Sequence, residues 1–411
     1  MKKLVFLLCS VAILGACAVK ESDSPDYDRP AFDGMSDEDV PGGAGGSNEN
    51  GSQGTSGVVT AGEWRDLDNW LFWSNLMTNK QVDQEGSDYT IYSDYWKLFT
   101  NNRVAVRVTD ESGVPQRDMQ VVLNQHQGIS DEAPTTLYVG RTDYRGEVNL
   151  WIGLAQQQAK VNVEDLGLLV NGGAEIRNVA VTNWGDEVKW NEVTASSAAP
   201  TNIDIAFIVD ATGSMMDEID FLKADLRNII SEVATRNATM SIRTAAVFYR
   251  DKDGDEYLTR ESDFSSDMSV TASFIAQQSA DGGGDYPEAV HTALEVGLQK
   301  LSWKEDNSIR LAFMLLDAPP HHEDNVIESL HKSIPQYAQK GIRIIPVAAS
   351  GVDKPTEFFL RFTAIATDGT YVFITNDSGV GNEHIAATVG QYEVEKLNEL
   401  IIRLINQYMS Y

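Results

Sequence analysis

The second half of the chain alternates between apolar runs and apolar residues at helical spacing. Residues 203–209 (IDIAFIV) form a nearly continuous apolar run, which is typical of a strand buried on both faces of a parallel sheet. A helical pattern extends from Met216 to Val233. Later patterns predict strands at 242–248, 311–316, 342–348 and 371–374 and helices at 287–301, 324–339, 356–366 and 389–408. This alternation predicts an α/β fold with a doubly wound, mostly parallel sheet, which we place at 196–411.

The preceding segment, residues 63–195, has the pattern of a small all-β sandwich with a short helix. Residues 64–79 carry apolar residues at largely helical spacing. Short β-runs bounded by Gly and Asp turns then follow at 104–108, 121–123, 137–139 and 148–152. The stretch at 194–201 (TASSAAPT) is small and polar, and it is predicted to link this domain to the next.

Two motifs in this segment carry a resemblance. Asp110-x-x-Gly113-x-Pro115 and Thr142-Asp143-x-x-Gly146 resemble motifs of the carboxypeptidase-regulatory-like β-sandwich family, over about 50 residues. The resemblance implies a structural or spacing role. Seven of the eight tryptophans lie before residue 200, and they raise the alternative of an exposed aromatic platform that binds glycans. We expect them to fill the core instead, above all Trp70, Trp73, Trp96 and Trp151.

The first residues have the pattern of a signal peptide and a lipid anchor. A basic Met1-Lys2-Lys3 precedes an apolar run at 4–14 that is too short to span a membrane, and Leu14-Gly15-Ala16-Cys17 follows. This end resembles the lipobox of bacterial lipoproteins, whose cysteine becomes lipidated and N-terminal. The resemblance implies a signal peptide at 1–16 and a membrane anchor on Cys17. An ordinary secretory signal cleaved near Ala18 is the alternative.

The segment at 17–62 begins with this cysteine and continues as a flexible tether. It is acidic at first and then rich in Gly, Ser and Asn, with too few large apolar residues to fold. An acidic cluster directly after the lipid cysteine resembles the surface-export signal of Bacteroidetes lipoproteins. The resemblance implies an outer-membrane protein that faces the cell surface. A tether on the periplasmic face is the alternative.

Charge and cysteine content exclude several classes of function. Asp and Glu number 61 against 32 Lys and Arg, a net charge of -29, so the surface repels phosphate backbones and we expect no nucleic-acid binding. The two cysteines, Cys9 and Cys17, lie at the N-terminus, so the folded part has no disulfide framework. After the N-terminus no apolar run is long enough for a transmembrane helix.

Polar clusters follow the predicted strands where the strands end. Asp210, Thr212 and Ser214 come directly after the strand at 203–209, and Asp317 follows the strand at 311–316. Asp285 stands in a glycine-rich stretch that precedes a helix. Ligands of such sheets bind at the carboxyl ends of the strands. These side chains offer hard oxygen ligands, which favour Mg²⁺, with Ca²⁺ and Mn²⁺ as alternatives.

The cluster also carries a family resemblance. The segment 210–215 (DATGSM) resembles the metal-ion-dependent adhesion site motif D-x-[ST]-x-S of von Willebrand factor A domains. FYRD at 248–251, GGGDYPEA at 282–289 and LDAPPH at 316–321 resemble the hemicentin-like branch in order and spacing. The resemblance implies that Asp210 and Asp317 anchor a divalent ion, with Ser214 bound directly and Thr212 directly or through water. A carboxylate of a partner protein would take the open coordination position.

Asp285 departs from the family pattern, in which many members carry Thr. If Asp285 joined Asp210 and Asp317, the occupied site would keep a net charge near -1, which favours Ca²⁺ or a neutral or basic partner group. This is a hypothesis about the ligand set.

Two other motifs are weaker. Residues 251–256 resemble the start of an EF-hand loop, but Glu256 and Ser262 stand where the motif needs Gly and Glu. His321 and His322 raise the alternative of zinc, but adjacent histidines point apart and HExxH is absent. There is no G-x-S-x-G and no Cys nucleophile, so we do not expect an enzyme.

Together the patterns predict a cell-envelope lipoprotein that binds an unknown protein partner through a metal site, in adhesion or assembly. One alternative is a scaffold subunit whose metal stabilises loops without contacting a partner. The other alternative is glycan binding by the aromatic middle domain.

Overall fold

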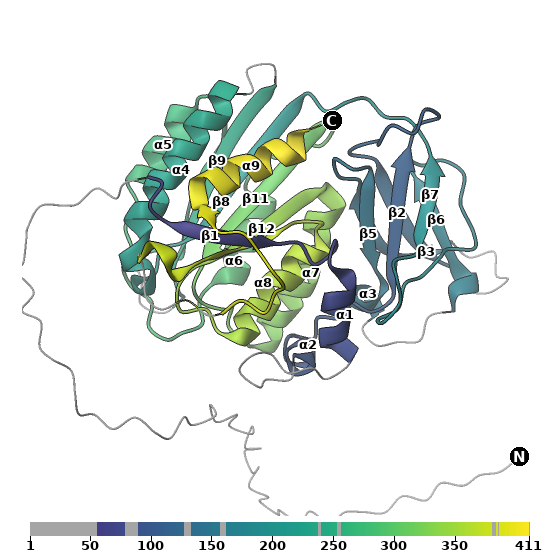
Figure 1. Cartoon of the computed structure of the whole chain (residues 1–411), viewed down its shortest axis with the longest axis horizontal. Coiled ribbons are helices and arrows are strands. Elements are labelled where there is room, and N and C mark those ends of the chain that lie inside the picture. Colours follow the sequence, from purple (N-terminus) through teal and green to yellow (C-terminus); the bar gives the residue numbers. More distant parts are fainter. Residues whose placement is uncertain are drawn as a thin grey trace, which may run out of the picture. The chain divides into compact units, whose positions relative to one another are not determined.

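The structure is a computed structural model of the whole chain. It describes residues 56–78, 89–126, 133–156, 162–236, 240–252, 256–379, 384 and 386–410. The predicted signal peptide, Cys17 and the predicted tether up to residue 55 lie outside the described residues. Residues 52–411 form one compact unit (Figure 1).

The centre of this unit is an eight-stranded sheet with the order β10-β9-β8-β11-β12-β13-β1-β14. The five strands from β9 to β13 in this order are parallel, while β10, β1 and β14 pair antiparallel at the two sides. The predicted doubly wound, mostly parallel sheet is therefore confirmed. The strands are β1 (Thr60–Trp64), β8 (Asn202–Asp210), β9 (Ser241–Tyr249), β10 (Thr259–Ser265), β11 (Ser308–Leu316), β12 (Ile342–Ala348), β13 (Tyr371–Ile374) and β14 (Glu395–Lys396).

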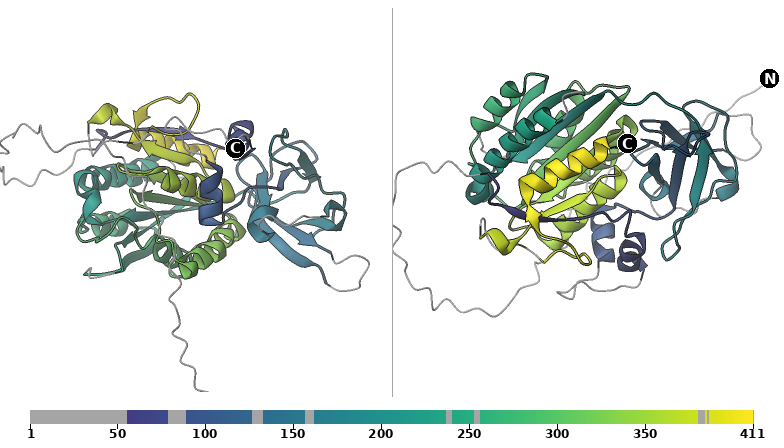
Figure 2. Two further views of the ribbon diagram at one scale, coloured as in Figure 1. Left: turned by 90° about the horizontal axis from the view of Figure 1, so that it is seen from below. Right: turned by 45° about the horizontal axis from the view of Figure 1, so that its top comes forward.

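Helices cover both faces of this sheet (Figures 1 and 2). Ile205, Phe207 and Val209 of β8 pack in the cluster that contains α4 (Met216–Arg236), α5 (Met268–Ala276) and α9 (Leu397–Met409). Ala206 and Ile208 face the opposite way and pack with α6 (Val290–Gln299), α7 (Asp324–Lys340) and α8 (Lys354–Ala366). Burial on both faces explains why this strand is apolar at nearly every position.

A smaller β-rich part contains two three-stranded sheets, β5-β2-β7 and β4-β3-β6. Strands β2 and β7 pair in parallel, and the other pairs are antiparallel. Asp110 and Asp143 shape the two predicted turns, because each carboxylate accepts two backbone N–H groups of its own turn at 2.8 to 3.0 Å. The strands are β2 (Arg103–Thr109), β3 (Gln120–Gln125), β4 (Thr135–Arg141), β5 (Glu147–Trp151), β6 (Leu166–Val170) and β7 (Trp190–Thr194).

The remaining described helices are short. They are α1 (Trp70–Thr78), α2 (Thr90–Trp96), α3 (Ile152–Gln156) and the single 3₁₀ turns η1 (Val163–Asp165), η2 (Gly213–Met215) and η3 (Asn376–Ser378). Of the described helices, none is long and apolar enough to cross a membrane.

The N-terminal boundary differs from the prediction. Residues 60–64, which we assigned to the tether and to the start of a helix, form β1 between β13 and β14, and α1 begins only at Trp70. This strand was not predicted, because it contains Gly62 and follows a segment rich in Gly, Ser and Asn, which indicated a flexible tether. A Cβ atom at Gly62 would lie 2.7 Å from ring atoms of both Phe373 and Tyr392, so the glycine makes room for these two rings. Gly62, which indicated flexibility in the sequence, is therefore required for close packing of these rings.

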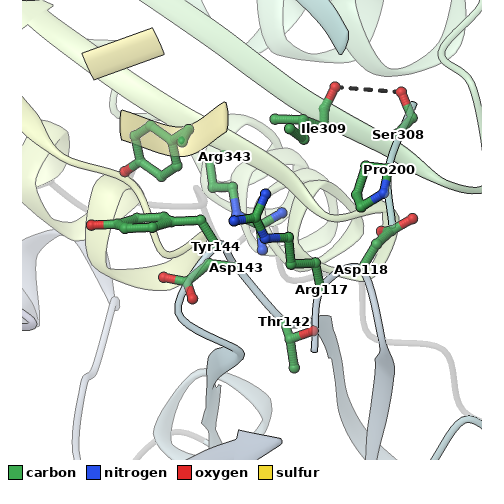
Figure 3. Close-up of a pocket in the computed structure, with 10 residues that line it drawn as sticks. Arg117, Asp118, Thr142, Asp143, Tyr144, Pro200, Ser308, Ile309 and Arg343 are labelled. Atoms are coloured by element: carbon green, nitrogen blue, oxygen red, sulfur yellow. Dashed lines mark hydrogen bonds between the residues drawn. The ribbon is translucent and has the colours of Figure 1, made fainter. Parts of the chain in front are cut away.

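The β-rich part is also not a separate spacer, since buried polar contacts join it to the large sheet. Asp118 pairs with Arg310 of β11 at 2.9 Å, and the Tyr138 hydroxyl donates to the Ala366 carbonyl of α8 at 2.9 Å. Figure 3 shows a small cavity at this junction, lined by Arg117 and Asp143 on one side and by Arg343 on the other.

The predicted linker is held in place as well. The Ser197 N–H donates to Gln116 Oε1 at 2.8 Å, and its hydroxyl donates to the Arg117 carbonyl at 3.0 Å. The predicted division at residues 195 and 196 therefore crosses a single compact unit rather than a flexible joint.

The tryptophans behave as core residues. Trp70, Trp73, Trp96 and Trp151 are each at most 3 % exposed. Trp73 stacks on Phe358 of α8 with 5.6 Å between ring centroids, so the aromatic residues of α1 and α2 pack against the large α/β part. These four side chains therefore cannot form the exposed glycan platform that we considered as an alternative.

Candidate functional site

The predicted oxygen ligands gather at the carboxyl edge of the two central strands. Asp210 is the last residue of β8, and Asp317 follows the last residue of β11. Because β8 and β11 are parallel neighbours, their ends lie side by side. Thr212 and Ser214 occupy the tight turn that leads through η2 into α4.

Hydrogen bonds hold this turn in shape. Asp210 Oδ1 accepts from the Thr212 backbone N–H at 2.9 Å and from its hydroxyl at 2.7 Å. The Thr212 and Ser214 hydroxyl oxygens lie 3.1 Å apart. Asp210 and Thr212 are buried and Ser214 is exposed, so the cluster opens to solvent on the side of Ser214.

Two carboxylate oxygens in this cluster have no hydrogen bond of normal geometry from the described residues, although the nearby hydroxyls of Tyr249 and Ser214 act to lower the pKa of Asp210 and Asp317 respectively. The two oxygens are Asp210 Oδ2 and Asp317 Oδ1, and both are buried. Burial raises the pKa of both acids above the usual range, and the charge of Asp210 raises that of Asp317 further. Two unsatisfied buried carboxylates in one place are costly unless a cation compensates them. The electrostatics therefore fit a bound cation.

Three further residues surround the cluster and were not among the predicted ligands. Tyr249, in register with Asp210, is buried, and its pKa is raised well above normal by burial and by the neighbouring acids, Asp210 first. Glu288 lies beside Thr212, since a Cβ atom at Gly283 would be 3.0 Å from Glu288 Oε1 and 3.2 Å from Thr212 Cβ.

The third residue, Glu218, is buried in the first turn of α4. It accepts a hydrogen bond from the Ser350 N–H at 3.1 Å and pairs with His384 Nε2 at 3.2 Å. Its position four residues after Ser214 was the available sequence signal, because an acid there lies one helical turn beyond the motif. Tyr249 stands in the FYRD stretch that resembles the family, but its place beside Asp210 could not be predicted, because strand register is a tertiary property.

Asp285, the fifth predicted ligand, belongs to a neighbouring group of residues. Its carboxylate lies with Asp251 and His321, and the three ligand atoms are within 4.8 Å of one another. No group of three or more acids, histidines or cysteines that contains Asp210 or Asp317 reaches that proximity among the described residues. The glycine-rich backbone itself does reach the turn, as the Gly213 N–H donates to the Gly282 carbonyl at 2.9 Å. The loop thus contacts the site with its backbone and presents Asp285 to a different group.

The two histidines point apart as predicted. His321 is buried, and its Nε2 lies 2.7 Å from Asp251 Oδ1. His322 is an exposed residue whose Nε2 lies 2.7 Å from the Tyr95 carbonyl oxygen, and its ring stacks on that of Tyr95 with 3.7 Å between ring centroids. The central residues of the EF-hand-like stretch, 253–255, lie outside the described residues.

Comparison with known proteins assigns the α/β part to a family. Residues 204–360 match the von Willebrand factor A domain family, so the chain contains a von Willebrand factor A domain. All five predicted ligands fall within the matched residues.

Two curated proteins are similar over part of their length. A putative ariadne-like RING finger protein of Acanthamoeba polyphaga mimivirus is 33 % identical over 132 residues, which is 32 % of this chain and 12 % of that protein. An alpha-protein kinase of Dictyostelium discoideum is 28 % identical over 211 residues, 51 % of this chain and 33 % of the kinase. The chain thus spans at most about a third of either relative.

Among solved structures, the conserved hypothetical protein BatB from Bacteroides thetaiotaomicron matches 50 % of this chain and 98 % of its own. It does so at 13 % identity with a TM-score of 0.35.

Proposed function

We propose that this protein binds a protein partner through a divalent cation held by Asp210, Thr212, Ser214 and Asp317. The observation that carries the proposal is the pair of buried oxygens without hydrogen bonds of normal geometry, Asp210 Oδ2 and Asp317 Oδ1, beside two hydroxyl groups. A von Willebrand factor A domain supports it, because such domains often mediate protein interactions.

The donor set fits a hard cation. Two carboxylates and two hydroxyls supply oxygen ligands, which suit Mg²⁺ best, with Ca²⁺ and Mn²⁺ as alternatives. Two ligand carboxylates balance the charge of a divalent ion, and the exposed side at Ser214 leaves access for a further ligand. Asp285 lies with another group, but Glu288 beside Thr212 is a third acid close to Asp210 and Asp317, so the occupied site still keeps a net negative charge. A neutral or basic side chain of the partner is then a more suitable last ligand than an acidic one.

We further propose that Cys17 carries lipid and anchors the protein in the outer membrane, with the domain on the cell surface. The support is the pattern of the first residues, and the periplasmic face is the alternative. The role is one of binding rather than catalysis. The ligand set supplies positions for a cation, and the sequence motifs offer no nucleophile beside it.

Thermal unfolding of the full chain tests the cation site. We expect Mg²⁺, Ca²⁺ or Mn²⁺ to raise the melting temperature of the chelator-treated protein, since a ligand at about 100 times its Kd stabilises by about 2.7 kcal/mol. Asp210→Ala should abolish this rise. Asp220→Ala is the matched control, because Asp220 is an exposed acid on α4 that pairs with Lys223. A rise that survives in Asp210→Ala would refute the ligand assignment.

Partner capture separates binding from scaffolding. Asp210 also holds the turn through Thr212, and this observation favours the alternative of a loop-stabilising metal in an envelope scaffold. If the binding proposal is right, capture of envelope proteins depends on the cation and is lost in Asp210→Ala. If the variant is less stable but captures the same proteins, the scaffold alternative holds.

A further inference from the structure

A second group of metal-ligand type lies beside the first at the same edge of the sheet. Asp251 follows the end of β9, Asp285 precedes α6, and His321 lies between β11 and α7. One carboxylate oxygen from each acid and one imidazole nitrogen lie within 4.8 Å of one another. None of these three residues is needed by the cation site proposed above.

The dimensions suit a transition-metal ion. Zinc takes oxygen and nitrogen ligands at about 2.0–2.2 Å, so neighbouring ligand atoms around it lie roughly 3–4 Å apart. His321 Nε2 and Asp251 Oδ1 are 2.7 Å apart, and Asp285 completes the set within 4.8 Å.

The three residues of this group differ in burial. Asp251 and His321 are 2 % and 6 % exposed, while Asp285 is exposed. The buried Asp251 and His321 side chains are therefore held in place before an ion binds, and an ion can enter from solvent on the side of Asp285. This arrangement differs from a cluster of surface acids, because a buried imidazole supplies one of the ligands.

The three loops are tied together by their backbones. The Glu288 N–H donates to the Pro319 carbonyl at 2.8 Å, which joins the segment after Asp285 to the segment before His321. Arg250 donates from Nη2 to the Ser279 carbonyl at 2.9 Å and from Nε to the Ala211 carbonyl at 3.1 Å. The loops that carry the ligands are therefore positioned without any ion.

An ion pair outside the group also joins two of these loops. Lys252 Nζ lies 2.6 Å from Glu323 Oε1, so the residue after Asp251 is joined to the segment that follows His321. The Lys252 ammonium is engaged by an acid outside the group.

We propose that Asp251, Asp285 and His321 bind a transition-metal ion of the Zn²⁺ type, distinct from the ion at Asp210 and Asp317. The ligand chemistry separates the two sites, since imidazole nitrogen favours borderline metals such as Zn²⁺ and an all-oxygen set favours Mg²⁺ or Ca²⁺. The inference goes beyond the proposed function and does not rest on it, because its ligands are a different set of residues.

Metal titration of the chelator-treated full chain tests this proposal. With Mg²⁺ at saturation, calorimetric titration should show one Zn²⁺ bound per chain, and Co²⁺ in its place should give the visible absorption bands of a nitrogen- and oxygen-ligated ion. Asp285→Asn and His321→Ala should each weaken Zn²⁺ binding at least ~10-fold. Asp285 is exposed, so its variant tests the site even if replacement of the buried His321 disturbs folding.

Two controls make the result specific. His322→Ala removes an adjacent histidine that stacks on Tyr95 and should leave Zn²⁺ binding unchanged. Asp220→Ala removes an exposed acid on α4 that pairs with Lys223, and it should also leave Zn²⁺ binding unchanged. If the wild type binds no Zn²⁺, or if Asp285→Asn and His321→Ala bind it as tightly as the wild type, the group is a histidine–aspartate pair only and the proposal is wrong.

Discussion

At the scale of single residues, Asp368 shows how the junction of the β-rich and α/β parts constrains a charge. It has a left-handed backbone with φ of 58° and lies buried between α8 and β13. Asn149 of β5 donates to it from Nδ2 at 2.5 Å and from its backbone N–H at 3.3 Å. Burial is the largest influence, and it raises the pKa of Asp368 to about 6.

This raised pKa predicts a loss of stability as the pH rises. Because the folded protein holds the proton more tightly than the unfolded chain, the contribution of Asp368 is complete below about pH 4 and is lost by about pH 6. Asp368→Asn removes this titration, and asparagine tolerates the left-handed backbone. From pH 4 to pH 7 the variant should gain up to about 3 kcal/mol relative to the wild type, measured by urea unfolding.

The exposed Asp377→Asn serves as the control, and its stability relative to the wild type should stay constant over the same pH range. An Asp368→Asn curve parallel to the wild-type curve would show that Asp368 is not protonated in the folded state.

At the scale of elements, α8 fixes the N-terminal segment through one buried ion pair. Arg361 of α8 donates to Asp66 from Nε at 2.9 Å and from Nη2 at 2.6 Å, and both side chains are at most 2 % exposed. The same guanidinium lies 4.9 Å from the ring centre of Trp73 in α1. This pair joins the segment after β1 to the face of the sheet that α8 covers.

Removing one partner should therefore be costly. Asp66→Ala removes the carboxylate that accepts two hydrogen bonds from the buried Arg361 and leaves it, among the described residues, only the more distant Glu357 at 3.8 Å as an ion-pair partner, so we expect a loss of about 3 kcal/mol in the free energy of unfolding. Asp68→Ala, two residues away, removes a carboxylate that is 38 % exposed in its pairs with Arg65 and Arg145, and should cost about 1 kcal/mol or less. Denaturant unfolding of both variants makes the comparison. Equal losses would contradict the role of the buried pair.

The elements also show what the sequence could predict. Continuous apolar runs revealed β8, β11 and β12, because both faces of these strands are covered by helices. Strand β10 (TRESDFS) escaped because an edge strand with half-exposed residues carries no apolar pattern. Strand β1 escaped because its residues contact partners more than 300 residues away, such as Ala61 opposite Ile374.

Some residues of the candidate site could likewise be predicted from the sequence, and others could not. Asp210, Thr212 and Ser214 could be predicted because one turn after one strand carries all three. Asp317 could be predicted because it stands at the end of the neighbouring parallel strand. The place of Asp285 could not be predicted, since it depends on how a loop with left-handed glycines at 282 and 283 folds against two other loops. Spacing in the chain determines positions on one element, but not the directions of side chains on separate loops.

At the scale of the whole molecule, the von Willebrand factor A domain depends on residues that precede it by more than 100 positions. Strand β1 pairs with β13 and β14, and Val59 and Ala61 are fully buried in the core beside α9. On the opposite face, Trp73 and Tyr89 pack on Phe358. The N-terminal segment thus completes the sheet and contributes to the cores on both of its faces.

A fragment of residues 196–411, the domain that sequence patterns alone define, should therefore be less stable than residues 56–411. It lacks β1, so the edge of β13 and the apolar surface around Phe358 become exposed, and unpaired edges favour association. We expect a lower melting temperature, faster proteolysis and aggregation in size-exclusion chromatography. If the 196–411 fragment is instead monomeric and has the same melting temperature as the 56–411 fragment, the first part of the chain is a dispensable spacer.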